Sequence, residues 1–244
     1  MNALQTAWAW LTSAPQWQGP DGVPARLIQH LEYTGIALAL AALIALPLGL
    51  LIGHTGRGSF AIVTLANFGR ALPTLGLVIL AFLSTNGSSA AVLVALVVLA
   101  IPPIMVNTYE GVQGVDRDVK DAARGMGMTA PQVLLRAEIP VAMPLILLGL
   151  RTAAIQVVAT ATIAAYIGLG GLGRYIIDGL ARSDYAMVGG GAMVVVALAL
   201  AVQVLFVAIR RLAVPAGLRG QAQRPRTGRR RGGSILPIFQ NPFS

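Results

Sequence analysis

Residues 121–127 of the chain read Asp121-Ala122-Ala123-Arg124-Gly125-Met126-Gly127, and Pro140 follows thirteen residues after the last of them. This stretch lies in a polar segment, residues 109–138, that separates two long apolar runs, residues 90–106 and 141–167. A chain made mostly of apolar runs does not usually keep so long a polar segment without a partner for it. We therefore expect the segment to present a docking surface to another protein.

Local signals divide this polar segment into two short helices. Residues 117–125 mix acids and bases and predict the first helix. Gly127 predicts a reversal of the chain after it, because a residue with a Cβ resists the positive φ of such a turn. Thr129 predicts the cap of a second short helix with Pro131 in its first turn, and Pro140 is expected to end the unit.

The composition is that of a polytopic membrane protein. Hydrophobic residues make up 56% of the chain and charged residues 11%, with a mean hydropathy of +0.73, whereas about 25% charged residues is usual for soluble domains. The chain has no cysteine, which excludes disulfides and thiolate metal sites. The two histidines lie far apart, so we expect no metal site and no catalytic site. The net charge of +9 gathers beside the apolar runs and in the C-terminal part, which favours positive-inside topology over nucleic-acid binding.

Five apolar runs each approach the roughly 20 residues that cross a bilayer as a helix. They cover residues 33–53, 60–83, 90–108, 141–167 and 186–209. Gly49 and Gly53 have the spacing that lets two membrane helices approach closely. We expect the prolines within these runs to kink or open helices rather than to forbid them. The expected fold is therefore all-α and polytopic, with about five transmembrane helices and one docking loop.

The basic residues predict the orientation in the membrane. With the docking segment in the cytoplasm, the outer side holds only Arg26, Arg174 and Arg182, and all other basic residues outside the runs lie inside. This asymmetry predicts an external N-terminus and a cytoplasmic C-terminus. Residues 1–29 are then an external segment, 30–212 the membrane domain, and 213–244 a basic cytoplasmic tail whose composition predicts disorder. The tryptophans of the first segment are expected at the membrane boundary, with a cage for a quaternary ammonium group as the alternative: Trp8, Trp10 and Trp17.

The stretch from Asp121 to Pro140 resembles the EAA loop of ABC-importer permeases, which forms a pair of coupling helices. Asp121 stands in place of the usual glutamate, Ala137 in place of an aliphatic residue, and Ile139 in place of leucine. Other segments resemble the osmoprotectant branch of this family, which carries glycine betaine, choline, carnitine or proline. They are residues 70–73, 149–153 and 165–173, and the resemblance as a whole covers roughly residues 30–212.

This resemblance implies a permease subunit in the plasma (inner) membrane of a bacterium, which is not itself an enzyme. It implies four partners: cytoplasmic ABC ATPase subunits that hold ATP and Mg, a second permease subunit, identical or different, an extracellular or periplasmic solute-binding protein, and membrane lipid. The chain lacks the G-x-x-x-x-G-K-[ST] motif of ATP-binding loops, so no cofactor is expected in it. The residues expected to form the ATPase-docking loop are Asp121, Ala122, Ala123, Gly127, Ile139 and Pro140.

Certain polar residues and prolines of the apolar runs are candidates for the solute pathway or for helix packing: Arg70, Pro73, Arg151, Gln156 and Thr160. An arginine at a helix centre costs about 2.5–3.5 kcal/mol on insertion scales, so Arg70 and Arg151 are expected either to pair with another helix or to face the pathway. Four glycines predict a turn at the outer mouth, before a short helix at residues 174–180 that acts as a gate: Gly168, Gly170, Gly171 and Gly173. Their letters match a dinucleotide-binding fingerprint, but no strand precedes them, so nucleotide binding is not expected.

Three other functions stay open. The first is an ABC permease for another small solute, such as an amino acid. The second is a self-sufficient secondary transporter, which would predict acids buried in the membrane, whereas the nine acids lie at the ends of runs or in loops. The third is a membrane scaffold without transport activity, which leaves the spacing of the docking segment unexplained.

Overall fold

A computed structural model describes residues 2–71 and 73–214 of the chain. Within these residues the chain is helical and contains no strand, which confirms the expected all-α fold. The elements, in chain order, are α1 (Ala3–Thr12), η1 (Ala14–Trp17), α2 (Val23–Thr55), α3 (Ser59–Ala71), α4 (Thr74–Ser84), α5 (Ser89–Gln113), α6 (Arg117–Gly125), α7 (Ala130–Val133), the π-helical turn η2 (Leu134–Glu138), α8 (Ile139–Ala164), η3 (Ala165–Ile167), α9 (Gly173–Ala181) and α10 (Tyr185–Ala213). The expected basic tail, residues 213–244, lies outside the described residues apart from its first two.

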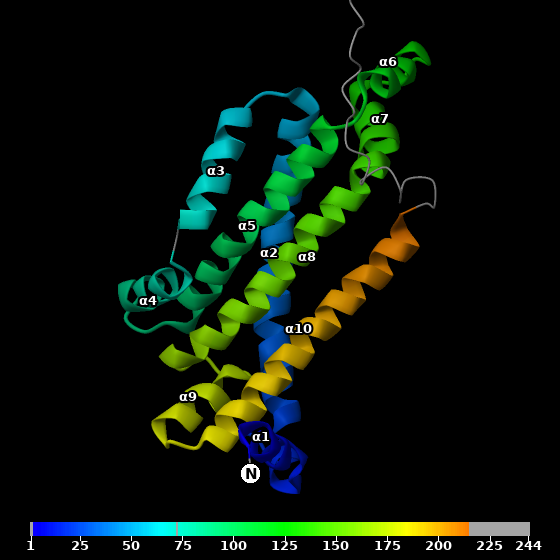
Figure 1. Ribbon diagram of the computed structural model, residues 1–244. Coiled ribbons are helices and arrows are strands. Elements are labelled where there is room, and N and C mark those ends of the chain that lie inside the picture. The colour runs from blue at the N-terminus through cyan, green and yellow to red at the C-terminus, as the bar shows by residue number, and fades with distance from the viewer. Residues whose placement is uncertain (1, 72, 215–244) are drawn as a thin grey trace, which may run out of the picture.

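Four helical segments are long and apolar enough to cross a membrane: α2, α5, the segment from α7 through α8, and α10. They run alongside one another in Figure 1, with α6 and α7 at one end of the bundle and α1 and α9 at the other. We call these the α6 end and the α9 end. Prolines remain inside α2, α5 and α8, as the sequence predicted. The chain is thus a multi-pass membrane protein whose docking segment projects from one end.

The expected continuous span at residues 60–83 is wrong. It consists of two shorter helices, α3 with 13 residues and α4 with 11 residues, each too short to cross the bilayer alone, which takes roughly 20 residues. Pro73 is the N-cap residue of α4. A proline has no N–H for a helical hydrogen bond and disfavours helical geometry in the residue before it, so the run breaks there. Figure 1 shows α3 descending from the α6 end and α4 lying near the α9 end.

The first long helix also differs from the prediction, because α2 begins at Val23 and not at Tyr33. Gly22 is its N-cap residue and Pro24 stands in its first turn, where the missing N–H leaves no helical bond unmade. The proline-rich composition before residue 30 therefore opens a helix rather than interrupting one.

Small residues set the distance between α2 and its neighbour α5. Three alanines on one face of α2 are fully buried in the core that α2 shares with α5 and α8: Ala37, Ala41 and Ala45. Gly49 and Gly53 continue this side of the helix. A Cβ on Gly49 would lie 2.9 Å from the Met105 carbonyl oxygen, and one on Gly53 would lie 2.8 Å from the Val112 Cβ. The close approach predicted from the glycine spacing is confirmed.

Candidate docking loop and membrane cavity

The first helix of the docking segment, α6, has the bounds that the sequence predicted. Asp116 caps it, because its side chain accepts a hydrogen bond from a backbone N–H two residues further on, at 3.1 Å. Gly127 follows the helix with a φ of +82°. The N–H of Met128 then donates to the carbonyl of Ala123 at 3.2 Å, which is the bond that closes a helix through a left-handed glycine. The predicted positive φ at Gly127 is confirmed.

After Gly127 the chain forms one continuous helical path. The N–H of Thr129 donates to the Gln132 side chain at 2.8 Å and caps the start of α7. α7 passes through the π-helical turn η2 directly into α8. Pro140 lies in the first turn of α8, where the docking segment passes into the membrane helix, so the helical path continues beyond the docking unit. The π turn before Pro140 already departs from the α-helical bonding pattern, so the missing proline N–H breaks little there.

The outward side of α6 and η2 mixes charged and apolar side chains. Val119, Met126 and Leu135 are exposed, Met126 to 72%. Asp121 and Arg124 form an exposed ion pair at 3.3 Å. Exposed apolar side chains surrounded by charges are typical of a surface that binds another protein. We call the following exposed residues the docking surface: Val119, Asp121, Ala122, Arg124, Met126, Gly127 and Leu135.

Three of the six residues predicted for the docking loop belong to this docking surface. They are Asp121, Ala122 and Gly127. Ala123 is buried and packs α6 toward the bundle. Ile139 is half-buried, and Pro140 is exposed at the start of α8.

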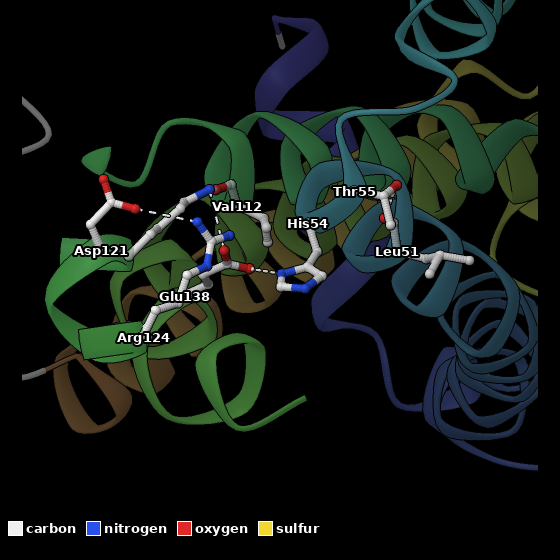
Figure 2. A network of polar contacts seen from close by, with 8 residues as sticks. Leu51, His54, Thr55, Val112, Asp121, Arg124 and Glu138 are labelled. Carbon is white, nitrogen blue, oxygen red and sulfur yellow. Dashed lines mark hydrogen bonds and ion pairs between the residues drawn. The ribbon is translucent and has the colours of Figure 1, made fainter. Parts of the chain in front are cut away.

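Behind the docking surface, three ionisable side chains meet at Glu138, whose carboxylate points toward the His54 ring in Figure 2. The Glu138 side chain is fully buried. Its Oε2 lies 2.6 Å from Nδ1 of His54 in the last turn of α2, and its Oε1 lies 3.3 Å from Nζ of Lys120 on α6. Lys120 Nζ also donates to the carbonyl of Val112, near the end of α5, at 3.1 Å. We call His54, Lys120 and Glu138 the buried junction. Sequence reasoning missed it, and its one available signal was that Lys120 is the only lysine of the chain.

Within the bundle, a cavity of about 270 Å³ lies between α3, α5 and α8. Its lining is mostly apolar and contains three neutral polar side chains, those of Asn107, Thr152 and Gln156. The Asn107 side chain donates to the carbonyl of Pro103 at 2.7 Å, which leaves its own oxygen as an acceptor. The cavity-lining side chains that the structure describes carry no charge. Such a lining offers hydrogen bonds to a small polar solute without fixing an ion in place.

The structure separates the other residues predicted for the pathway. Arg151 donates from Nε to the Gln203 side chain on α10 at 2.7 Å, which supports helix pairing for this arginine. Thr160 is buried in α8. Pro73 is exposed at the start of α4, and Arg70 lies within α3. Gln156, which also belongs to the predicted set, lines the cavity.

The four glycines predicted as an outer gate form a tightly packed turn at the α9 end. Gly168 and Gly171 have φ values of +88° and +83°. The N–H of Gly171 donates to the Gln29 side chain on α2 at 3.1 Å. A Cβ on Gly170 would lie 2.5 Å from that same Gln29 oxygen, and one on Gly173 would lie 2.0 Å from the carbonyl oxygen of Thr162. The turn is therefore held against α2. Its glycines allow both close contact with neighbouring atoms and positive φ values.

The N-terminal tryptophans do not form the arrangement of a cage. Trp10 packs edge-on against Tyr175 of α9, with ring centroids 5.2 Å apart, whereas Trp8 and Trp17 are exposed. The Tyr175 hydroxyl donates to the carbonyl of Asp21 at 2.6 Å. Burial raises the pKa of Tyr175 to about 12, so the phenol stays neutral and keeps this hydrogen bond at physiological pH.

Comparison with known proteins identifies relatives of this chain. Residues 45–216 match the family described as binding-protein-dependent transport system inner membrane component. The glycine betaine/carnitine/choline transport system permease protein of Bacillus subtilis is 33% identical over 195 residues, which cover 80% of this chain and 90% of the relative. The carnitine transport permease protein of Listeria monocytogenes is 36% identical over 72% of this chain and 80% of its own length. The osmoprotectant import permease protein of Salmonella typhimurium is 32% identical over 78% of this chain and 91% of its own length.

A solved structure supports the fold independently. A chain of the MetNI methionine ABC transporter, in an inward-facing conformation, superposes on the structure with a TM-score of 0.71. The superposition covers 84% of this chain and all of the other one, at 20% sequence identity. At that identity the likeness establishes the fold alone, which is that of an ABC-importer permease.

Proposed function

Because the chain belongs to the family of binding-protein-dependent transport system inner membrane components, the permeases of ABC importers, we propose that it imports osmoprotectants with energy from a partner ATPase. The solutes are small zwitterions or quaternary ammonium compounds of the glycine betaine, choline, carnitine and proline type. The solutes after which the three relatives are named support this solute class. The observation that carries the mechanism is the docking surface, which projects beyond the membrane helices on α6.

In this proposal the docking surface binds a cytoplasmic ABC ATPase subunit, which holds ATP and Mg. Four membrane-spanning helices and the shorter α3 and α4 are too few to enclose a pathway. A second permease subunit therefore completes the pathway. A solute-binding protein delivers the solute at the α9 end. Closure of the ATPase tilts the docking segment as a rigid body and opens the pathway toward that end.

The cavity of Asn107, Thr152 and Gln156 is the proposed passage for the solute within this subunit. Its amide groups suit the carboxylate or hydroxyl of an osmoprotectant, and its apolar walls suit the methyl groups. The three polar groups of the described lining are neutral, which favours weak binding, and transit requires weak binding. Arg70 and Pro73 lie on either side of the α3–α4 break, and we propose that this break borders the passage, while Thr160 and Arg151 pack helices.

The docking segment is proposed to be cytoplasmic, with the N-terminal end of α2 outside. The basic residues at the α6 end support this orientation: Arg57, Arg117, Lys120, Arg124 and Arg136. Because the chain has no cysteine, single thiols can be placed cleanly at exposed sites. In intact cells an impermeant maleimide should label Thr85→Cys, near the α9 end, and should label Asp118→Cys only after permeabilisation. Labelling in the opposite order would contradict the orientation.

The proposed function predicts ATP-dependent uptake of osmoprotectants. Vesicles that contain this chain, its ATPase and its binding protein should accumulate radiolabelled glycine betaine, choline, carnitine or proline when ATP is supplied on the ATPase side. Replacing Gln156 by leucine should lower this uptake about tenfold, because a lost hydrogen bond to a charged group is worth about 1.5–3 kcal/mol. ATPase association should stay unchanged in that variant, since Gln156 lies far from α6.

The same vesicles separate the alternatives. Uptake without the ATPase would indicate a secondary transporter and overturn the proposal. Competition by methionine, with no effect of the four osmoprotectants, would indicate a permease for another solute. Wild-type uptake in the Gln156→Leu variant would remove the cavity from the pathway while leaving the transport function in place.

A further inference from the structure

The buried junction joins four helical elements at a single carboxylate. His54 belongs to the last turn of α2, Lys120 to the middle of α6, and Glu138 to the π-helical turn that opens α8. The second bond of Lys120, to the carbonyl of Val112, adds the last turn of α5. Lys120 on α6 and Glu138 before α8 therefore link the docking segment to the ends of α2 and α5.

The burial of Glu138 makes its partners necessary. Its side chain has no exposed surface, while those of His54 and Lys120 are each only 15% exposed. A carboxylate removed from water is strongly disfavoured unless an opposite charge and hydrogen bonds compensate it. Here His54 Nδ1 is the hydrogen-bond partner of Oε2, whereas Oε1 has no hydrogen bond within the described residues and is compensated by the charge of Lys120, 3.3 Å away. Such a group fixes the relative position of the elements that supply its partners.

Lys120 also compensates a second charge. The C-terminal end of a helix carries partial negative charge on carbonyls that lack helical partners, and a cation is stabilising there. The ammonium group binds one of these carbonyls at the end of α5. Lys120 thereby ties α6 to α5 and to Glu138 with one side chain.

The π-helical turn explains how Glu138 reaches this position. A π turn contains one more residue per turn than expected for an α-helix, and such turns occur often at functional sites. In η2 the neighbouring Leu135 and Arg136 are exposed, whereas Glu138 is buried. The turn therefore directs one acid inward from a segment whose other side belongs to the docking surface.

We propose that the buried junction is a positioning cluster that transmits movement of the ATPase from α6 to α2, α5 and α8 together. This inference rests on the proposed function and names the residues that connect the docking surface to the membrane helices. Without the buried junction, α6 would still bind the ATPase. The movement would then shift α6 against the bundle instead of moving α2, α5 and α8. The junction therefore controls the number of solute molecules moved per ATP rather than the binding of the ATPase.

The test uses the complete transporter in vesicles, with Glu138→Gln, Lys120→Met and the double variant. Three quantities are measured: ATPase association, basal ATP hydrolysis and solute uptake per ATP hydrolysed. Lys120→Met leaves the carboxylate without its cation, so uptake per ATP should fall about tenfold, within the usual range of coupling between sites. Glu138→Gln keeps the shape and a hydrogen bond to His54, so its loss should be smaller. The double variant should resemble Glu138→Gln alone, because it removes the uncompensated charge that harms Lys120→Met.

Glu32→Gln is the matched control, since it makes the same chemical change at an exposed carboxylate of α2 near the α9 end. It should transport as the wild type does. The dissociation constant of the ATPase should stay within about twofold of wild type in all variants. Substitution of a residue that contacts the ATPase would instead raise this constant about tenfold for each 1.4 kcal/mol of binding free energy lost. If Lys120→Met fails to fold, solute uptake per ATP in Glu138→Gln and in the double variant is still compared with that of the wild type.

Two results would overturn the inference. If association falls in parallel with uptake, the buried junction only maintains the shape of the docking surface. If uptake per ATP is unchanged in every variant, the junction has no part in transmission. Both results leave the proposed function standing, because that function fails only if the wild-type vesicles show no ATP-dependent uptake.

Discussion

Replacing Gly127 by valine should uncouple ATP hydrolysis from solute uptake while the membrane helices still assemble. The φ of +82° at this position disfavours any residue with a Cβ, by about 1–2 kcal/mol and by more for a β-branched side chain. No atom lies within 4 Å of a Cβ built on Gly127, so the strain comes from the backbone alone. The turn must then open and rotate α6 against α7. Uptake and solute-stimulated ATP hydrolysis should fall about tenfold or more, since each 1.4 kcal/mol is a factor of ten.

Gly125 supplies the matched control for this prediction. It lies two residues earlier, at the end of α6, and a Cβ built on it also meets no atom within 4 Å. Its φ is not positive, so Gly125→Ala should couple normally while Gly127→Ala already shows a partial loss. Asparagine tolerates the left-handed region better than other residues, and Gly127→Asn should recover part of the coupling. Normal coupling in Gly127→Val would show that this turn does not belong to the transmission element.

Replacing Gly49 by leucine should prevent the transporter from folding to its native packing. The added Cβ would meet the Met105 carbonyl oxygen and the Thr108 Cβ of α5, each at 2.9 Å. Overpacked cores usually lose about 1–3 kcal/mol, and here part of the obstacle is backbone, which cannot choose another rotamer. We expect little monodisperse protein in detergent and a lower midpoint of thermal unfolding. ATPase binding should be lost with it, because α6 then has no natively packed bundle to hold it in place.

Gly35 tests whether the effect depends on the contact and not on losing a helical glycine. It lies on α2 as well, and a Cβ on it meets nothing within 4 Å. Gly35→Leu should therefore express and unfold like the wild type, or be slightly more stable, because glycine weakens a helix interior by about 0.8–1.0 kcal/mol. Equal unfolding midpoints for the two leucine variants would contradict the packing of α2 against α5.

Local signals sufficed to predict the docking segment. The bounds of α6 and the positive φ of Gly127 depend on neighbouring residues, so a short stretch of sequence contains the information. Four of the five long apolar runs became long helices for the same reason. The break at Pro73 was not predicted, since hydropathy does not distinguish a proline that kinks a helix from one that ends it. The start of α2 was misplaced because the apolar run begins only at residue 33, whereas the helix already starts at Val23 with Pro24 in its first turn.

Pairing between distant helices was out of reach of the sequence alone. His54 and Glu138 are 84 residues apart, and their contact depends on the rotation of both helices about their axes. The π turn sets that rotation for Glu138, and the local pattern of apolar and polar residues does not reveal a π turn. The same holds for Arg151, whose hydrogen bond to Gln203 on α10 supports pairing and depends on a residue 52 positions away. The sequence indicated which residues are costly in a membrane, and the three-dimensional arrangement decided how each is satisfied.

The uninterrupted path from α7 through α8 gives the subunit unequal lever arms. If the fulcrum lies at Glu138, the short arm is Ala130–Glu138 and the long arm is Ile139–Ile167. At about 1.5 Å per residue these arms measure about 13 Å and about 43 Å, so a displacement at the ATPase is magnified roughly threefold at the far tip. That tip adjoins the glycine turn held by Gln29. With such unequal arms, a small displacement of the short arm moves the far tip further, but it requires a correspondingly larger force.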